Sequence, residues 1–260
     1  SVRWDFNNQW GYIRPKIGVH ATYYDLGSFG NQSGRHVSRI LPIFNVDTGM
    51  TFERNANLFG NAYLQTLEPR LFYNYIPTKS QNDLPNFDTS ENSFSYNQLF
   101  RENLYVGNDR INSANSLTAA VQTRFFNPNN GAELFRAGIG QKFYFKNDKV
   151  LLDGNVSRYE RSQSDWVGFA HGKLSDSFHV GFDLHYNQNQ SRAESYAATV
   201  RYNPEPGKVL SARYKYGRNE RIYLQSDGNY FYDKIRQVDL AAQWPIRKNL
   251  YAVARYNYEI

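Results

Sequence analysis

The chain has 260 residues, of which 30 are basic and 24 acidic, giving a formal net charge of +6, and it contains no cysteine. The lack of thiols excludes disulfides, zinc–cysteine sites and cysteine nucleophiles. The basic residues are scattered along the chain, which argues against a nucleic-acid partner because such partners select a basic stripe. No apolar run approaches the ~18 residues of a transmembrane helix, while 18 Phe, 21 Tyr and 4 Trp are too many aromatics for a disordered chain.

Apolar and polar residues alternate with a period of two along most of the chain, which is typical of β-strands with one apolar and one polar face. In residues 10–24, Ile17 and Val19 lie on one face while Arg14 and Lys16 lie on the other. A further strand at residues 2–6 begins partway through its alternating pattern. In chain order, the alternation predicts strands at 10–24, 45–53, 66–75, 116–125, 135–145, 166–174, 178–186, 194–202, 209–216, 238–244 and 250–258.

Strand length and aromatic placement favour a membrane barrel over a soluble β-sandwich. Several strands exceed the ~5–6 residues usual in globular sheets. Tyr73, Tyr75, Phe145 and Trp244 stand near strand ends, as in the aromatic girdles of outer-membrane barrels. The apolar face should then meet lipid, and the residues expected there are Ile17, Val19, Val46, Met50, Leu71, Val121, Ile139 and Leu240.

The connectors give independent support, because short and long ones mostly alternate; only 187–192 is brief where a long loop is due. The short ones include 127–131, 175–177, 203–207 and 247–248, and the long ones are 26–36, 77–114, 146–164 and 218–234. Outer-membrane barrels have short periplasmic turns and long external loops. The predicted fold class is therefore all-β, a transmembrane antiparallel up-and-down β-barrel in the Gram-negative outer membrane. Hydrocarbon offers no hydrogen-bond partner to the backbone amides of an unpaired edge strand. About 11–12 strands without a closing element at either end therefore suggest that residues 1–260 form an arc of a larger barrel.

Prolines inside predicted strands suggest irregular pairing. Proline removes a ladder hydrogen bond and is tolerated at bulges or opened seams. Pro15, Pro42 and Pro69 are therefore expected to mark irregular ladders.

The stretch from Leu67 to Asn115 resembles the LptD (OstA-type) family of lipopolysaccharide-assembly outer-membrane proteins. Similarity extends through Trp244-Pro245-Ile246 to the end of the chain. The matching residues, in the order of the family, are Leu67-Glu68-Pro69-Arg70, Tyr73-Asn74-Tyr75-Ile76-Pro77, Gln81, Asp83, Pro85-Asn86-Phe87-Asp88, Leu99-Phe100-Arg101, Gly107-Asn108-Asp109-Arg110 and Ala114-Asn115.

The resemblance implies a very large barrel, preceded by a periplasmic jellyroll domain and plugged by an LptE-like lipoprotein. Its implied role is non-enzymatic: the barrel receives lipopolysaccharide from the periplasmic bridge and places it in the outer leaflet. The jellyroll and the cysteines of many members are absent here. The chain therefore resembles a middle-to-late arc of the barrel that lacks the terminal strands of the lateral gate.

The connector from 77 to 114 is too long to be a simple turn, and we expect it to fold on itself as an extracellular loop. A short helix is expected at 95–102, with Leu99 and Phe100 as its packing residues. The polar residues Glu68, Arg70, Asp88, Asp109 and Arg110 either shape the path of an anionic glycolipid or pin this loop in the lumen. Pinning is favoured, with Glu68 paired to Arg70 or Asp109 paired to an arginine. The family pattern adds Pro69, Pro85, Arg101, Gly107 and Asn115 to these loop-organising residues.

No residue set predicts catalysis, a metal or a cofactor. His179, Asp183 and His185 share one strand face, but a polar lumen wall explains them better than a metal site. The favoured function is transport and insertion of lipopolysaccharide; the alternatives are a passive porin and an outer-membrane enzyme with its site on the loops. Basic lumen residues would offer partners for phosphate, and the candidates are Arg14, Lys16, Arg124, Arg136 and Lys142.

Overall fold

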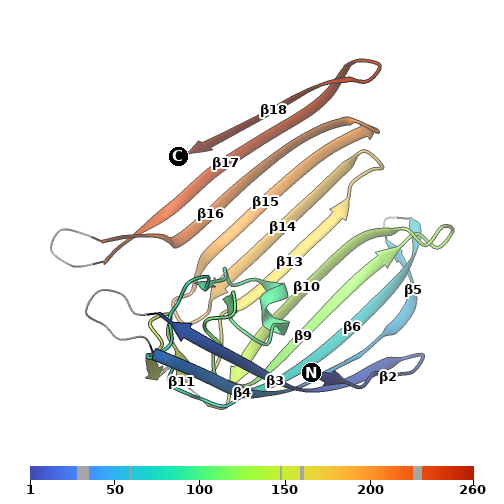
Figure 1. Ribbon diagram of the computed structural model, residues 1–260. Coiled ribbons are helices and arrows are strands. Elements are labelled where there is room, and N and C mark those ends of the chain that lie inside the picture. The colour runs from blue at the N-terminus through green and yellow to red at the C-terminus, as the bar shows by residue number, and fades with distance from the viewer. Residues whose placement is uncertain (28–34, 59, 147, 159–160, 225–229) are drawn as a thin grey trace. The chain divides into compact units, whose positions relative to one another are not determined.

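The structure is a computed structural model that describes residues 1–27, 35–58, 60–146, 148–158, 161–224 and 230–260. It is built almost entirely of β-strands, with one short 3-10 helix, η1 (Tyr96–Phe100), in a long connection (Figure 1). Within these ranges, no helix combines the length and the apolar character needed to cross a membrane.

Fourteen strands form one large antiparallel sheet in the order β1-β3-β4-β6-β9-β10-β13-β14-β15-β16-β17-β18, while β2 pairs with β3 and β5 with β6. Each long strand pairs with the long strands before and after it in the chain, so the predicted all-β, up-and-down antiparallel fold is confirmed. Their bounds are β1 (Val2–Arg3), β2 (Phe6–Asn7), β3 (Gly11–Leu26), β4 (Arg35–Met50), β5 (Phe52–Leu58), β6 (Asn61–Ile76), β9 (Ala114–Phe126), β10 (Glu133–Tyr144), β13 (Trp166–Lys173), β14 (Phe178–Asn187), β15 (Arg192–Glu205), β16 (Lys208–Leu224), β17 (Tyr230–Arg247) and β18 (Leu250–Glu259).

Four further short strands form two small ladders in the connections. β7 (Ser90–Glu91) pairs with β8 (Tyr105–Val106), and β11 (Asp148–Val150) pairs with β12 (Val156–Arg158).

The predicted strands exist, but three of their ends lie eight or more residues from those predicted. β4 starts at Arg35 rather than at 45, because residues 35–39 are mostly polar and residues 40–44 are apolar on both faces, so that neither part alternates. The segment 218–234 is not simply a long connector, because β16 and β17 extend into it from both sides. The sequence of this segment shows no regular alternation of apolar and polar residues. Residues 225–229 of that connector lie outside the described residues.

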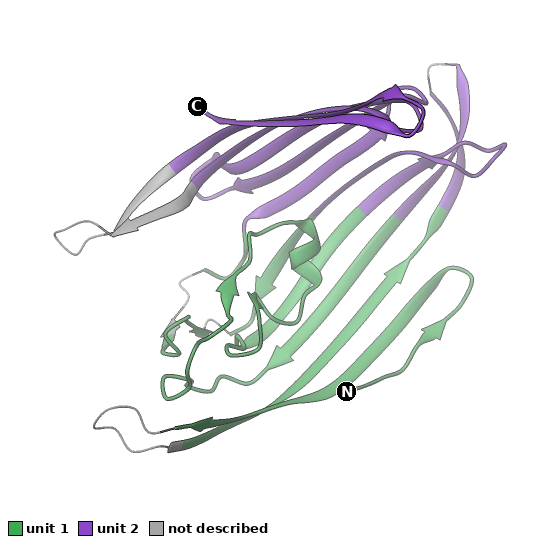
Figure 2. Ribbon diagram, turned by 45° about the horizontal axis from the view of Figure 1, so that its top comes forward, with its two compact units in different colours: residues 1–52, 68–121, 140–164 green, residues 53–67, 122–139, 165–260 purple. Residues whose placement is uncertain are grey.

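The chain divides into two compact units (Figure 2). Unit 1 contains residues 1–52, 68–121 and 140–164, and unit 2 contains 53–67, 122–139 and 165–260. In unit 1, β4 shows how the strands separate their faces. Arg39, Leu41 and Asn45 are 1–4% exposed beneath the connection between β6 and β9, whereas Ile40 and Phe44 are 61% and 37% exposed. The buried side is hereafter the covered face of unit 1.

The residues predicted to meet lipid lie on exposed strand faces. Ile17, Val19, Met50, Leu71, Ile139 and Leu240 are 44–62% exposed, and Val46 and Val121 are partly exposed. A soluble monomer rarely presents so many large apolar side chains along contiguous strands. This distribution is the one expected of strands that cross hydrocarbon.

Aromatic side chains pack together near strand ends. In unit 1, Tyr73 lies between Phe44 and Phe145, with ring centroids 6.3 and 6.4 Å away. In unit 2, Phe178 and Tyr202 pack at 4.5 Å beside the short turn that follows β13. Such clusters next to the connections are typical of the interfacial girdles of membrane strands.

The proline prediction holds for Pro69 but not for Pro15 and Pro42. β3 and β4 keep an unbroken register in which Pro15 pairs with Val46 and Pro42 with Val19. The carbonyl of Pro15 points away from β4, because it accepts the N–H of Trp4. The nitrogen of Pro15 points to the same side as its carbonyl, so its missing N–H removes no hydrogen bond of the β3–β4 ladder. Pro69 comes directly before Arg70, the first β6 residue paired with β4, and so lies where the partner of β6 changes between β4 and β5.

Candidate functional site

The connection between β6 and β9, residues 77–113, folds onto the covered face of unit 1 and is called the capping loop below. Its apolar side chains Leu84, Leu99, Tyr105 and Ile111 are only 0–7% exposed. Ile111 packs with Leu41 and Ile76 of the strands in the core of the unit. The helix η1 lies inside the short helix predicted at 95–102. Hydrophobic burial therefore attaches this connection to the sheet along its length.

Asp109 is the centre of the hydrogen bonding within the capping loop. Its Oδ1 accepts the hydroxyl of Tyr24 from β3 at 2.6 Å, and its Oδ2 accepts the N–H groups of Phe87 and Asp88 at 2.6 and 2.9 Å. Burial works to raise the pKa of Asp109, but these hydrogen bonds outweigh it and hold the pKa below its ordinary value. The expectation that the Asp109 carboxylate pairs with an arginine is therefore wrong, because neutral donors occupy it.

Arg39 of β4 extends from the strand wall into the loop, and the sequence patterns did not single it out. The residue is 1% exposed. Its Nη1 donates to Gln81 Oε1 at 2.5 Å and to the Asp109 carbonyl at 2.6 Å, and its Nη2 donates to the Asn108 carbonyl at 2.7 Å. Gln81 in turn donates from Nε2 to the Ile111 carbonyl at 2.7 Å. A buried guanidinium thus joins two distant parts of the loop to the sheet.

Arg110 binds backbone carbonyls. Its Nη2 donates to Leu84 at 2.7 Å, its Nη1 to Pro85 at 2.9 Å and its Nε to Leu152 at 2.9 Å. Leu152 belongs to the turn between β11 and β12, so Arg110 connects the capping loop to that hairpin. Tyr105 makes a parallel link through its hydroxyl to the Val150 carbonyl at 2.5 Å, and burial raises the pKa of Tyr105 to about 12.

Gly107 allows the chain to turn between β8 and Asp109. Its φ is +85°, and a Cβ at this position would lie 2.6 Å from the carbonyl oxygen of Asp88. Only glycine fits both the conformation and the space. Asp88 Oδ1 then accepts the N–H of Asn108 at 3.2 Å, and Thr89 Oγ1 accepts the N–H of Asp109 at 3.1 Å.

Glu102 connects the end of η1 to three strands, and the sequence patterns also missed it. Its carboxylate forms an ion pair with Lys16 of β3 and accepts Nδ2 of Asn45 at 2.8 Å. Its backbone carbonyl accepts Nδ2 of Asn74 at 2.8 Å. The neighbouring Arg101, which the family pattern suggested, is exposed, and its side chain has no polar partner among the described residues.

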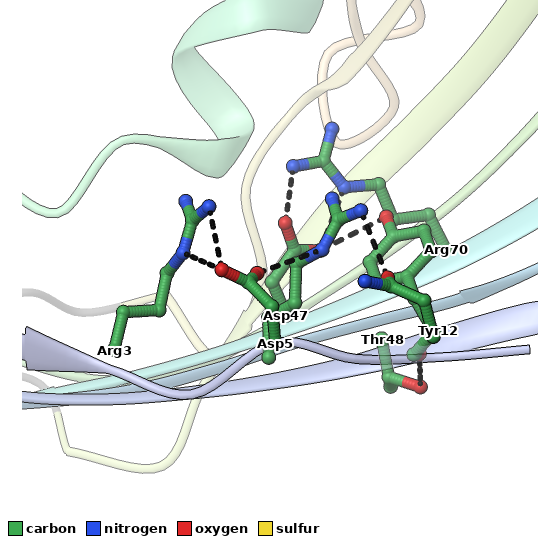
Figure 3. Close-up of polar contacts among 8 residues, drawn as sticks. Arg3, Asp5, Tyr12, Asp47, Thr48 and Arg70 are labelled. Atoms are coloured by element: carbon green, nitrogen blue, oxygen red, sulfur yellow. Dashed lines mark hydrogen bonds and ion pairs between the residues drawn. The ribbon is translucent and has the colours of Figure 1, made fainter.

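Arg70 pairs with Asp47, not with Glu68 as expected. Its Nε and Nη2 donate to the two carboxylate oxygens at 2.8 and 2.7 Å, and its guanidinium lies 3.8 Å from the ring centroid of Phe100 in η1. The expectation fails because Asp47 is a diagonal neighbour of Arg70 across the β4–β6 ladder, close enough for the long arginine side chain to form two parallel bonds. Figure 3 shows this pair beside Tyr12, whose hydroxyl donates to Asp47 at 3.3 Å.

A second ion cluster stands beside this pair at the start of the chain. Asp5 binds Arg3 at 3.1 Å and Arg14 at 3.2 Å (Figure 3 labels Arg3 and Asp5). Arg14 also stacks on Tyr12 at 4.1 Å. Among the remaining motif residues, Asn115 accepts the hydroxyl of Tyr73 at 3.0 Å.

The basic residues expected to offer phosphate contacts have mostly found partners inside the chain. Arg14 binds Asp5 and Lys16 binds Glu102. Arg124 and Arg136 approach Glu133 at 3.7 and 3.6 Å. Lys142 is 4% exposed on β10. Their role in binding phosphate stays a prediction.

His179, Asp183 and His185, which were considered as a metal site, do not share one partner. His185 lies 2.9 Å from Asp165, and Asp183 lies 3.2 Å from His171. No group of three or more His, Cys, Asp or Glu side chains suited to a metal ion occurs in the part of the chain that the structure describes.

Long antiparallel strands with an exposed apolar face, a buried polar network and a long folded connection are the features of an integral outer-membrane protein built from transmembrane β-strands. The model of the LptD family, described as LPS transport system D, matches residues 1–250. The chain belongs to the LptD family. The family is a non-enzymatic transport family of the Gram-negative outer membrane.

Curated relatives match almost the whole chain. The LPS-assembly protein LptD of Neisseria meningitidis (serogroup B, strain MC58) is 66% identical over 258 residues, which cover 99% of this chain and 32% of that protein. The protein of the same name from Chromobacterium violaceum is 44% identical over 99% of this chain and 32% of its own length. That of Nitrosomonas eutropha is 37% identical over 100% and 34%. The chain thus spans about a third of the length of the curated relatives it matches.

Proposed function

We propose that this chain forms part of the barrel wall of the lipopolysaccharide translocon of the outer membrane, and that the full-length protein inserts lipopolysaccharide into the outer leaflet. The observation that carries the proposal is the 66% identity, over 99% of the chain, to an LPS-assembly protein LptD. In this arrangement residues 1–260 are a partial barrel domain, and the capping loop is an extracellular loop folded into the lumen.

The two strand faces fit an amphipathic glycolipid. The exposed face carries apolar side chains such as Ile17 and Leu240, which match the hydrocarbon of acyl chains. The opposite face carries charged and amide side chains such as Arg70 and Asn74, which suit sugars and phosphates. A lumen of this kind would accommodate the head of the glycolipid while its chains remain in the membrane.

The capping loop is the proposed contact for a plug partner, an LptE-like lipoprotein. The loop is internally rigid, because Arg39, Asp109 and Arg110 each make several hydrogen bonds within it. A rigid loop offers a preorganised surface, which lowers the entropic cost of association. Delivery from the periplasmic lipopolysaccharide bridge would involve parts of the full-length protein outside these residues.

Depletion of the full-length protein in its own host tests the proposal. Surface-exposed lipopolysaccharide, measured by labelling of intact cells, should fall, and lipopolysaccharide should accumulate inside the outer membrane. Re-expression of the same protein is the control and should restore surface labelling. Unchanged surface labelling after complete depletion would refute the transport function.

A passive porin is the alternative, and conductance separates the two. A porin should give steady single-channel currents when the full-length protein is reconstituted alone in a planar bilayer. The translocon proposal expects a stoichiometric plug lipoprotein in the purified complex and little current through it.

A further inference from the structure

Unit 2 contains an open groove on the polar face of β13 to β16, with a volume of about 550 Å³. The polar lining residues occupy alternate positions of these strands and therefore point to the same side. They include His171, His179, Asp183, Thr199, Arg201 and Arg213.

The strand register brings the cationic residues of the groove together. His179 is directly opposite Arg201, and Thr199 is directly opposite Arg213. Arg201 and Arg213 are therefore diagonal neighbours on adjacent strands, with backbones about 7–8 Å apart. Both side chains carry positive guanidinium groups, so an anion bound between them would be attracted by both.

The nearby carboxylates are already engaged. Asp183 lies 3.2 Å from His171. Asp239 stands opposite Arg213, but both of its oxygens bind Arg255. Neither Arg201 nor Arg213 forms an ion pair within the described residues, in contrast to Arg70 with Asp47 in unit 1.

A third group in the groove lacks a partner. The Nδ1 atom of His179 is buried and makes no hydrogen bond. It belongs to the residue directly opposite Arg201. The hydroxyl of Thr199 supplies a further donor beside Arg213.

We propose that this groove is a binding site for the phosphate groups of lipopolysaccharide, and this inference rests on the proposed function. A guanidinium donates two parallel N–H bonds to phosphate oxygens, so two unpaired arginines on neighbouring strands suit a phosphate monoester. The groove differs from the sequence-predicted candidates Arg14, Lys16, Arg124 and Arg136, which have carboxylate partners in the chain.

Photo-crosslinking in the full-length protein, purified with its barrel partner, tests the site. A photoreactive amino acid replaces Val209, which lines the groove, or Leu210, which faces the opposite side of the same strand. The probes are purified lipopolysaccharide and the same material after enzymatic removal of its phosphates. Crosslinking through Val209 should fall about tenfold for the dephosphorylated probe, as expected for the loss of a charge-assisted contact. Crosslinking through Leu210 should not depend on the phosphates.

Substitutions in the groove should reproduce the effect of phosphate removal. R201Q combined with R213Q should lower the Val209 crosslink by a similar factor, whereas lysine at both positions should retain more of it. R236Q, on the other face of β17, is the matched control and should leave the yield unchanged. Inorganic phosphate should compete for the crosslink more strongly than sodium chloride of equal ionic strength. If the glutamine variant fails to fold, the dephosphorylated probe on the unaltered protein decides the question.

Equal crosslinking of the two probes through Val209 would overturn the phosphate site and leave the transport function standing, because lipopolysaccharide would still reach the polar face. Competition by phosphate no stronger than by chloride would overturn it in the same way. Normal surface lipopolysaccharide in depleted cells would refute the transport function itself, whatever the groove binds.

Discussion

The hydroxyl of Tyr24 and the carboxylate of Asp109 lie 2.6 Å apart, which joins β3 to the capping loop through a single short hydrogen bond. The other carboxylate oxygen of Asp109 holds two backbone N–H groups of the same loop. One ionised side chain therefore contributes both to the attachment of the loop to the sheet and to the fold of the loop itself.

Acid should release the capping loop. Because the pKa of Asp109 is lower in the folded protein than in the unfolded chain, its stabilisation is complete above the unfolded value of about 3.9. The stabilisation is lost as the pH falls through the lower, folded value. Hydrogen exchange of the amides of Phe87 and Asp88 in detergent-solubilised full-length protein should show this loss. Asp109→Asn should weaken their protection at neutral pH and remove its dependence on pH between 5 and 2, a window of about three units around the carboxyl range.

Arg110→Ala should open the loop to protease. The change leaves the carbonyls of Leu84, Pro85 and Leu152 without their common donor, and each buried unsatisfied group costs about 1–3 kcal/mol. Arg110→Lys should rescue little, since an ammonium cannot match the planar fork of donors. Arg101→Ala is the matched control, because this adjacent loop arginine is exposed. Limited proteolysis and copurification of the plug lipoprotein are the measurements; equal behaviour of the two alanine variants would show that the buried network does not hold the loop.

Gly107→Ala should destabilise the loop more than Gly131→Ala destabilises the turn after β9. Both glycines have positive φ, +85° and +68°, so each alanine costs about 1–2 kcal/mol in backbone strain. At Gly107 the new Cβ would also meet the Asp88 carbonyl at 2.6 Å, whereas nothing lies within 4 Å of a Cβ at Gly131. Protection of the Asp109 amide against hydrogen exchange should fall in the first variant and remain in the second. A larger loss from Gly131→Ala would contradict the crowding inferred at Gly107.

Val121→Arg should impair the folding of the membrane strands, whereas Gln122→Arg should be tolerated. Val121 lies among the side chains predicted to meet lipid, where an arginine near the midplane costs about 2–4 kcal/mol. Its neighbour Gln122 points to the opposite strand face, beside Gly138. The shift between folded and heat-denatured forms on electrophoresis gives the folded fraction of each full-length variant. Equal folded fractions would show that β9 does not separate a lipid face from a polar face.

The sequence patterns predicted strands wherever exactly one strand face is apolar, and they failed where this condition does not hold. In β4 the run Ile40-Leu41-Pro42-Ile43-Phe44 is apolar on both faces, because the capping loop buries Leu41 while Ile40 stays exposed. Beyond Gly217 the sequence shows no alternation of apolar and polar residues, although β16 continues to Leu224.

The polar network was only partly predictable. The motif residues Asp88, Gly107, Asp109 and Arg110 do meet in one cluster, as the resemblance suggested. Arg39 and Glu102 were missed because a charged residue in a strand or loop carries no local sign of a partner about 60–70 residues away. Arg70 was assigned to Glu68 because the two are close in sequence, whereas its partner Asp47 becomes a neighbour only through strand pairing.

The contacts of Arg110 also bear on which substitutions the capping loop can accept. A side chain that binds only main-chain carbonyls depends on the path of the loop and not on the side-chain chemistry at 84, 85 and 152. With the loop outside the cell, as proposed above, a lineage could vary exposed loop side chains without refolding the main chain beneath them.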